Sequence, residues 1–527
     1  MNRHHQSLML LQNRLNLKTN IVANFVGLGS SFLVGMIAVP FYIKFLGIDG
    51  YGLVGFYATL QAVFNSFLDF GFSVTLNREL ARYMTSSVKN NQSRDLVRTM
   101  EIAYWLIGLF LGGLVCLAAP LIATYWLNSE TISEPVIKNI VVLMGIITFV
   151  QWPLTLYQGG LIGLQRMVLL NGISTALVVL RGVGGVLVLW FHPSVLVFFL
   201  WQLFISVLQV CLTMLLLWRS LPASDHLPHF NLTLLRTTGR FAAGMTATSF
   251  FSFFIDYGDR LILSKILNLE YFGYYSLATT LNDQLQLISS PIHRALFPQL
   301  SSLVETKDLE TLKGLYHKAS QYVSVAILPI VGTAVVFASQ LILIWTQDIN
   351  ITNQVVPIAS LLFMGTIFIN LMGVPYTLTL AYGWAKPGFY RALIAFLILL
   401  PLTLIFSLRY AGVGAALAWA IFNLGSLILF PWFVHRKLLK TELKHWVIAD
   451  VGYPTLTSMI ILVIIYWMIP ADLPMIQVIF AVVFVFLFTF GCTVLSARDI
   501  RGLALEYLGK MTSRAFKKSH SNNRTVG

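Results

Sequence analysis

Charged residues are scarce in this sequence. Asp, Glu, Lys and Arg make up 11% of its 527 residues, whereas about 25% is usual in soluble globular proteins. Hydrophobic residues make up 57%, and the mean hydropathy is +0.77. This composition excludes a soluble enzyme, a disordered chain and an ordinary nucleic-acid-binding domain, so we expect no nucleic acid as a partner.

Cysteine is also rare. The three cysteines, Cys116, Cys211 and Cys492, all lie inside apolar runs, which argues against a disulfide framework and against a thiolate metal site. The sequence contains no G-x-x-x-x-G-K-[ST] phosphate loop and no H-E-x-x-H pair, and its 10 histidines are scattered without ligand spacing. We therefore expect no ATPase, no bound metal and no cofactor.

Long apolar runs are what the sequence has in abundance. A helix needs about 20 mostly apolar residues to cross the hydrocarbon core of a bilayer, and Gly and Pro are tolerated in such helices. The runs predict an all-α polytopic membrane protein with about 14 transmembrane helices. They lie near 20–45, 52–76, 102–127, 136–162, 168–190, 194–217, 241–267, 273–297, 320–346, 354–382, 389–408, 412–434, 447–469 and 473–496.

The basic residues lie mostly on one side of these runs. With the N-terminus in the cytoplasm, 29 of the 35 Lys and Arg residues fall in cytoplasmic segments and 4 on the opposite side, while Arg181 and Arg260 lie inside runs. Positive residues concentrate in the cytoplasmic loops of membrane proteins. We therefore expect both termini in the cytoplasm.

The two halves of the chain are related by a shift of 221 residues. Residues 46–52 then fall on residues 267–273, and both stretches are the external turn between the first two helices of a half. The shift spans six helices, an even number, so both halves have the same orientation in the membrane, as in known transporters. We expect a six-helix bundle over 1–220, a second, parallel bundle over 221–435, and two further helices with a basic tail over 436–527.

Polar residues recur at helical spacing inside several runs. Spacings of three and four put Gln61, Asn65 and Asp69 on one helix face, and Asp283 and Gln286 on another. Polar residues commonly join membrane helices through hydrogen bonds. Stripes that contain amides and charges also fit a water-filled cavity.

Charges inside the runs are more informative, because a charge at the bilayer centre costs at least about 2.5–3.5 kcal/mol. Arg181 is followed by a glycine-rich stretch, and small residues permit close approach of another helix or a ligand. A single continuous helix would hold Asp256, Asp259 and Arg260 within about one turn. Arg260 would then neutralise one carboxylate and leave the other for a proton or a cation.

Three stretches of the sequence resemble a known family. The first runs from Asn20 through Pro40-Phe41-Tyr42 to Leu46-Gly47 and Tyr51-Gly52, the second from Asp69-Phe70-Gly71-Phe72 to Asn77-Arg78-Glu79, and the third from Tyr157-Gln158-Gly159-Gly160 to Arg166 and Asn171. Together they resemble the O-antigen and polysaccharide flippases of the polysaccharide transporter family, within the multidrug/oligosaccharidyl-lipid/polysaccharide exporter superfamily.

The resemblance implies two six-helix bundles around a central cavity that opens alternately to the two sides of the bacterial inner membrane. The implied cargo is an oligosaccharide on undecaprenyl diphosphate, and the implied partners are membrane lipid and other polysaccharide-assembly membrane proteins. Without an ATPase, a gradient of H⁺ or Na⁺ would drive transport. The candidate substrate-binding residues are Arg181, Arg260, Asn65, Gln61, Gln286, Arg78 and Arg294, and the candidate ion-coupling residues are Asp256, Asp259, Asp69 and Asp283.

Other functions stay open at this point. A cation-coupled multidrug exporter of the same superfamily would need a cavity dominated by carboxylates and aromatics. The two arginines inside the runs favour an anionic cargo, whereas the four candidate carboxylates keep the exporter open. A membrane polysaccharide polymerase or ligase would be expected to carry a sizeable external loop, and the external loops here are short. Arg78 and Arg294 lie at cytoplasmic helix ends, where positive charge is also a topology signal.

The charge distribution makes a testable prediction about topology. A reporter that is active only in the cytoplasm is expected to be active when fused after Gly527 and inactive when inserted within 130–135. Activity assays of the two fusions in whole cells measure this directly. An external location of the C-terminal reporter contradicts the count of 14 helices, because an even number of crossings returns the chain to its starting side.

Overall fold

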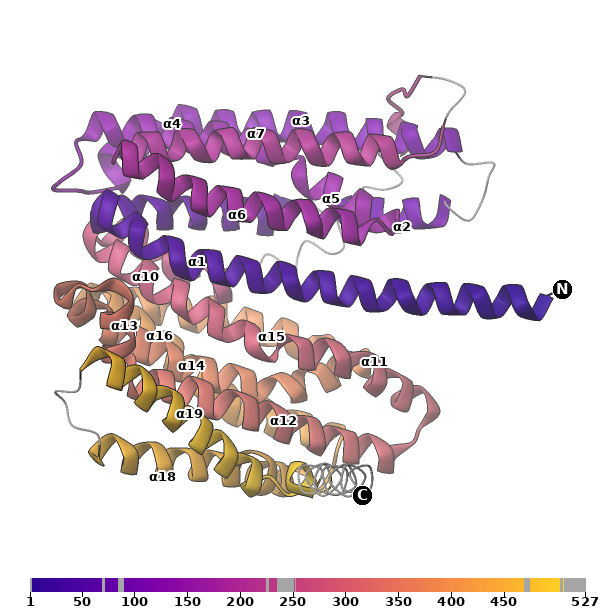
Figure 1. Ribbon diagram of the computed structural model, residues 1–527, viewed down its shortest axis with the longest axis vertical. Helices are drawn as coiled ribbons and strands as arrows, with labels where there is room; N and C mark the ends of the chain where they lie inside the picture. Colours follow the sequence, from indigo (N-terminus) through magenta and orange to yellow (C-terminus); the bar gives the residue numbers. More distant parts are fainter. Residues whose placement is uncertain are drawn as a thin grey trace, which may run out of the picture. The chain divides into compact units, whose positions relative to one another are not determined.

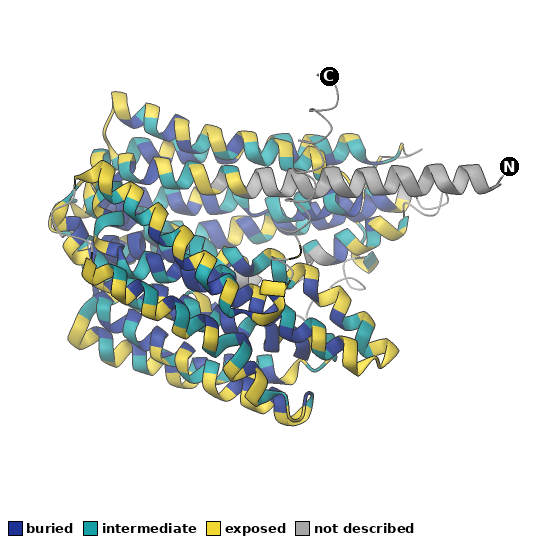
Figure 2. Cartoon of the chain, turned by 60° about the horizontal axis from the view of Figure 1, so that its bottom comes forward, coloured by how far each residue is buried: buried dark blue, intermediate teal, exposed yellow. Residues whose placement is uncertain are grey.

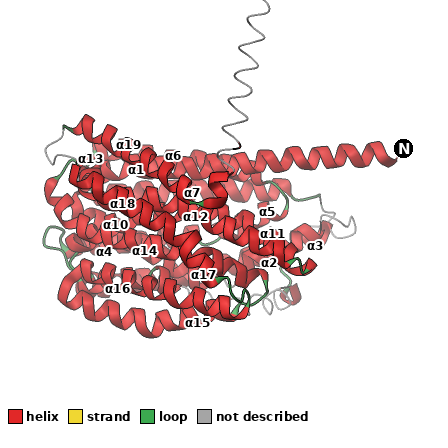
Figure 3. Cartoon of the chain, turned by 90° about the horizontal axis from the view of Figure 1, so that it is seen from below, coloured by secondary structure: helices red, strands yellow, loops and turns green. Residues whose placement is uncertain are grey.

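The computed structural model describes residues 2–68, 72–83, 90–223, 227–234, 251, 253–468, 474–502 and 506. These residues form helices joined by short connections, and none of them belongs to a β-strand (Figure 3). The apolar runs fold as helices because hydrocarbon offers the backbone N–H and C=O groups no partner outside the chain. The prediction of an all-α membrane fold is confirmed.

Ten helical stretches of the described residues are long and apolar enough to cross a membrane. Two of them, Phe32–Asn65 and Lys386–Lys437, each cover two predicted runs, because a backbone break divides each stretch, at Gly47 and at Ala411 respectively. The predicted runs near 241–267 and 273–297 are not among the ten. The protein therefore crosses the membrane several times, and the count of 14 stays a prediction.

The chain divides into two compact units, residues 1–276 and 277–527. In the first, α3 packs on α4, α4 on α7, and α6 on both α1 and α7 (Figure 1). The three predicted domain ranges stay a prediction. The helices of this unit are α1 (Asn2–Leu68), α2 (Phe72–Tyr83), α3 (Asn90–Leu121), η2 (Ile122–Trp126), α4 (Glu134–Gln151), α5 (Leu154–Gly163), α6 (Met167–Phe191), α7 (Val195–Ser220), α9 (Gly258–Ile266) and the first part of α10 (Leu269–Gln286).

In the second unit, α14 packs on α12 and α16, and α12 also contacts the last two long helices, α18 and α19. Asp308 begins α12: its carboxylate accepts the Thr311 N–H at 3.1 Å, and hydrogen bonds from the Thr311 hydroxyl and amide lower the pKa of Asp308. The elements of this unit that follow α10 are η3 (Leu287–Ser289), α11 (Ser290–Thr306), α12 (Leu309–Val336), α13 (Ala338–Thr346), α14 (Ile349–Ala381), α15 (Lys386–Ile394), η4 (Ala395–Leu399), α16 (Leu400–Lys437), α17 (Leu443–His445), η5 (Trp446–Gly452), α18 (Tyr453–Met468) and α19 (Met475–Ser496).

Large apolar side chains line the outer faces of the helices in both units. Leu117 on α3 is 81% exposed and Trp467 on α18 is 82% exposed, and exposed residues recur along the outward sides of the helices in Figure 2. Monomeric soluble proteins rarely present contiguous apolar patches of this extent. These faces are suited to contact with lipid.

The two external turns that the repeat relates contact each other within the first unit. A Cβ atom at Gly52 would lie 2.3 Å from the Leu269 carbonyl oxygen, and a Cβ atom at Gly273 would lie 2.4 Å from the Ile48 carbonyl oxygen. The shift of 221 residues takes each residue of one pair onto a residue of the other pair. The contact is therefore reciprocal, as a twofold relation between two like segments requires.

A third pair related by the same shift lies beside this contact. A Cβ atom at Gly55 would lie 2.1 Å from the Ser276 Oγ. A residue that touches its own counterpart in the other repeat lies close to the axis that relates the two. Glycine at this position, as at Gly52 and Gly273, lets the two helices approach to backbone contact.

The reciprocal contact predicts that Gly52→Ala destabilises the protein. The new Cβ must displace a backbone carbonyl group, and overpacking of this kind costs about 1–3 kcal/mol. We expect a lower midpoint of thermal unfolding for the detergent-solubilised variant. Gly113→Ala in α3 is the matched control, because a Cβ atom there meets nothing within 4 Å and alanine favours the helix. Equal midpoints for the two variants would show that the contact does not hold the turns together.

Candidate functional site

Arg181 lies on α6, next to glycines that bring two other helices close. A Cβ atom at Gly182 would lie 2.1 Å from a Val34 methyl group on α1, and one at Gly184 would lie 2.2 Å from the Trp201 ring on α7. The Trp201 indole N–H donates a hydrogen bond to the Arg181 carbonyl oxygen at 3.2 Å. The small residues thus allow the close helix approach that the sequence predicts.

The Arg181 side chain is half-buried and has neutral partners. Its Nη2 donates to the Gln209 Oε1 at 2.9 Å, and its charge interacts with the hydroxyl groups of Tyr42 and Tyr57. Tyr42 in turn donates to the Gly182 carbonyl oxygen at 3.1 Å. These described contacts leave the positive charge of the guanidinium uncompensated.

Further amides and hydroxyls continue this polar region toward α4. The Tyr57 hydroxyl donates to the Gln151 Oε1 at 3.4 Å, and the Gln151 Nε2 donates to the Ser206 Oγ at 2.6 Å. Gln61 Nε2 donates to the Thr148 Oγ1 at 3.3 Å. We call the whole group, with members on α1, α4, α6 and α7, the Arg181 cluster: Tyr42, Tyr57, Gln61, Thr148, Gln151, Arg181, Ser206 and Gln209.

The second unit has a polar cavity of about 580 Å³ between the α10–α11 bend and α14. Two predicted substrate residues, Gln286 and Arg294, line it together with His293 and Thr377. The Thr377 hydroxyl lies 3.4 Å from the His293 Nδ1. The cavity forms where the 3₁₀ turn η3 interrupts the helical run, so that side chains on both sides of the bend line the same space.

The other predicted substrate residues lie apart from these two groups. Asn65 is exposed near the end of α1. Arg78 is also exposed, and its Nη2 donates to the Glu79 Oε1 at 2.8 Å. The Arg260 guanidinium lies over the Tyr257 ring, 5.2 Å from the ring centroid.

The candidate ion-coupling residues have different surroundings. Asp259 Oδ1 accepts the Arg260 backbone N–H at 2.8 Å, and its other oxygen accepts the Tyr275 hydroxyl. Asp256 is exposed, and Asp283 is half-buried on α10. Asp69 lies outside the described residues.

The expectation of one continuous helix through Asp256 and Arg260 is wrong. Tyr257 has φ −138° and ψ −1°, so that α9 begins only at Gly258. The break changes the relation between the two acidic residues: Asp259 lies in the first turn of α9, whereas Asp256 precedes the break. Negative charge in a first helical turn is favourable because the N-terminal N–H groups carry partial positive charge.

Sequence comparison adds a family assignment to this geometry. A family model described as polysaccharide biosynthesis protein matches residues 17–304. The chain belongs to this family. Two curated relatives carry the name "Putative O-antigen transporter". The Shigella flexneri protein is 28% identical over 214 residues, and the alignment covers 40% of this chain and 49% of that protein. The Escherichia coli (strain K12) protein is 27% identical over 77 residues, 15% of this chain and 19% of that protein.

The chain thus spans about half the length of the Shigella relative and less of the other. Solved structures extend the comparison to the whole fold of this family member. The lipid II flippase MurJ in an inward closed conformation matches with a TM-score of 0.69 at 15% identity, over 93% of this chain and 99% of that one. An inward-facing multidrug resistance MATE family transporter of the MOP superfamily matches with a TM-score of 0.60 at 13% identity, over 80% and 99%.

These matches confirm the resemblance and the membrane transporter fold predicted from the sequence. The proteins named are transporters and a flippase by name, in agreement with the prediction that the chain is no enzyme. At 13–15% identity the structural matches show the fold alone.

Sequence reasoning missed a buried carboxylate in this family member. Glu101 on α3 is 3% exposed. It accepts hydrogen bonds from the Tyr157 hydroxyl at 2.8 Å, from the Trp218 Nε1 at 3.2 Å and from the Arg98 Nη1 at 2.9 Å. Glu101 thereby joins α3, α5 and α7. Its position next to the apolar run near 102–127 was the available signal.

Sequence reasoning also missed a group of histidines and carboxylates in the second unit. His317, His445 and Asp450 bring their ligand atoms within 4.8 Å of one another. His317 is more than 120 residues from the other two, so no local spacing announces the group. Asp450, a lone acidic residue inside the run near 447–469, was the one signal in the sequence.

Proposed function

We propose that this protein is a flippase that moves oligosaccharide units linked to undecaprenyl diphosphate across the bacterial inner membrane by alternating access, in the assembly of O-antigen or another polysaccharide. The observation that carries the proposal is Arg181: a permanently charged residue inside a membrane-spanning helix, whose described partners are all neutral. Membership of the polysaccharide biosynthesis protein family supports the same cargo class.

The Arg181 cluster matches the chemistry of a sugar-linked diphosphate. Guanidinium forms planar, paired hydrogen bonds with phosphate oxygens and keeps its charge at any physiological pH. The neighbouring Gln and Tyr side chains supply donors and acceptors for sugar hydroxyl groups. Without such partners, each polar group of the cargo would cost several kcal/mol in hydrocarbon, whereas the polyprenyl tail is already at home in lipid.

The cavity of the second unit supplies a second group of the same kind. Arg294 offers another cation, and Gln286, Ser289 and Thr377 offer neutral hydrogen-bonding groups. We infer that Arg294 and Gln286 also contact the polar head of the cargo. Arg78 and Asn65, which are exposed, would meet the cargo before or after its passage.

An ion gradient would give the movement its direction. The sequence has no phosphate loop for ATP, and the acidic residues at the start of α9 can exchange a proton or Na⁺. Asp256 is the better candidate, because Asp259 already accepts hydrogen bonds from Tyr275 and from a backbone amide. We place both termini in the cytoplasm, and we expect membrane lipid and other polysaccharide-assembly proteins as partners.

A cation-coupled multidrug exporter is the second candidate, because the fold also matches a MATE family transporter. An organic cation would need a negative or purely aromatic cavity, since like charges repel strongly where water is excluded. The uncompensated charge of Arg181 opposes such a cargo. Resistance to organic cations, conferred by the parent protein and retained by an Arg181→Ala variant, would favour the exporter.

The flippase proposal predicts that Arg181→Ala lowers transport of the lipid-linked oligosaccharide about tenfold to hundredfold, since hydrogen bonds to charged groups contribute about 1.5–3 kcal/mol. Arg181→Lys keeps the charge without the planar guanidinium and should transport at an intermediate rate. Transbilayer movement in proteoliposomes and the amount of surface glycan in complemented cells measure both. Lys138→Ala, which removes an exposed positive charge from α4, is the control and should transport like the parent. Parental transport by Arg181→Ala at an equal membrane level contradicts the role of this residue.

The coupling proposal predicts different outcomes for two conservative substitutions. Asp256→Asn should leave the protein folded but slow or uncoupled, because it removes an exchangeable charge from an exposed position. Asp259→Asn should lower the unfolding midpoint, because it weakens the hydrogen bonds to Tyr275 and to the first turn of α9. Proton and Na⁺ movement in proteoliposomes, driven by a gradient of lipid-linked glycan, measures coupling. If both variants stay fully coupled, this pair is structural, and Asp69 or Asp283 becomes the next candidate.

A further inference from the structure

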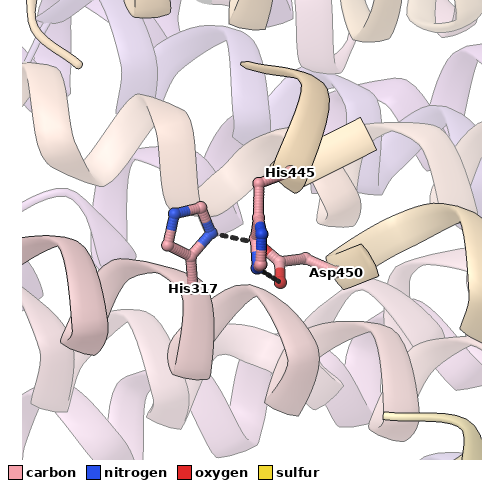
Figure 4. Close-up of side chains that lie close together, drawn as sticks. All are labelled: His317, His445 and Asp450. Carbon is pink, nitrogen blue, oxygen red and sulfur yellow. Dashed lines mark hydrogen bonds and ion pairs between the residues drawn. The ribbon is translucent and has the colours of Figure 1, made fainter. Parts of the chain in front are cut away.

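Three elements of the second unit bring two imidazole rings and a carboxylate together: His317 from α12, His445 from α17 and Asp450 from η5 (Figure 4). The His317 Nδ1 lies 2.5 Å from the Asp450 Oδ2, and the His445 Nε2 lies 3.8 Å from the Asp450 Oδ1. The two rings are edge to face, with centroids 4.4 Å apart. Residues far apart in the sequence thus point three ligand atoms at one small volume.

The local backbone explains how His445 and Asp450 come to face the same way. Residues Trp446–Gly452 form a π-helix, whose wider turn aligns residues five apart. Such segments are rare and occur frequently at functional sites. Asp450 is fully buried, whereas the His445 side chain is 47% exposed. The group therefore has a buried anionic base and an open side through which an ion can enter.

A second layer of contacts orients these side chains. The His317 Nε2 lies 3.3 Å from the Glu442 Oε2, and Glu442 also pairs with the Lys313 Nζ at 3.2 Å. A proton on Nε2, donated to Glu442, leaves Nδ1 as the lone-pair nitrogen that faces Asp450. The Gln321 Nε2 donates to the Asp450 Oδ1 at 3.0 Å. Carboxylate–histidine and amide–carboxylate contacts of this kind commonly hold the ligands of a metal ion.

Charge balance points the same way. With neutral histidines, three carboxylates, those of Glu442, Asp450 and Asp499, are linked through His317 and Gln321 within this group. One lysine, Lys313, is paired with Glu442 in the described contacts. Excess negative charge at a buried position requires a bound cation or a proton.

We propose that His317, His445 and Asp450 bind a divalent transition-metal ion, with Zn²⁺ as the best match. Imidazole nitrogens with one carboxylate oxygen are a ligand set that suits Zn²⁺, whereas Mg²⁺ and Ca²⁺ prefer oxygen ligands alone. Bonds of about 2.0–2.1 Å to a tetrahedral ion hold two ligand atoms about 3.3 Å apart. The ion thus replaces the hydrogen bond between His317 and Asp450, and small side-chain rotations suffice. Water can fill the fourth position.

The ion would connect α12 to the segment that leads into α18. Because α18 and α19 pack on α12, such a link stabilises the docking of the last two long helices of the chain. This role concerns the stability of the second unit, and it is independent of the nature of the cargo.

The experiment uses the full-length protein in detergent, purified through a tag without histidine and freed of metal with a chelator. Co²⁺ is the probe, because its visible absorption reports the number and geometry of its ligands, and Zn²⁺ displaces it from such sites. We expect one equivalent of Co²⁺ to give absorption bands that Zn²⁺ abolishes, and we expect Zn²⁺ to raise the unfolding midpoint. His445→Ala should weaken the affinity at least about tenfold.

The choice of variants separates metal binding from general damage. His445 is half exposed, so its truncation should leave the metal-free protein folded, with an unfolding midpoint near that of the metal-free parent. His192→Ala, at an exposed position in the first unit, removes a histidine elsewhere and should bind Co²⁺ like the parent. Absence of the absorption bands in the parent, or equal affinity in His445→Ala and the parent, overturns the proposal and leaves the group as a hydrogen-bonded connection between helices.

Discussion

Every polar group that this chain places inside the membrane must find its partner within the protein, because hydrocarbon supplies none. The main chain meets this requirement by forming helices throughout the apolar runs. Side chains meet it only where several helices converge. Glu101 accepts donors from its own helix, from α5 and from α7, and Asp450 accepts donors on α12. Buried carboxylates of this kind determine which helices have to stay together.

Close helix approach is the second condition, since hydrogen bonds reach only about 3 Å. Glycine provides it at two places. Beside Arg181, Gly182 and Gly184 let α1 and α7 approach until side chains touch the α6 backbone. At the external turns, Gly52 and Gly273 let two repeat-related segments approach to carbonyl contact. Small residues thus do for membrane helices what apolar burial does for soluble ones, because lipid gives helices no hydrophobic reason to associate.

The sequence predicts the helices, the repeat and the family well because each depends on local pattern or composition. The apolar runs correspond to helices, and the shift of 221 residues anticipates the contact of Gly52 with Leu269. The polar sites were predicted less well. Periodicity missed the break at Tyr257, since nothing in an apolar run marks a local departure from helical φ and ψ. It also missed His317 with Asp450, because only the tertiary fold brings residues of α12 and η5 together.

The ionisable groups of the two units differ in what they can exchange, and this difference suits them to different roles. Arginine keeps its proton at any physiological pH, so Arg181 can hold an anion but cannot carry protons between the two sides of a membrane. Aspartate and histidine can change protonation state or take up a metal ion. A protein that moves an anionic cargo against its own preference needs both kinds of group, and it must keep them apart, because a carboxylate next to Arg181 would compete with the cargo for its charge. The neutral amides and hydroxyls around Arg181 meet that requirement.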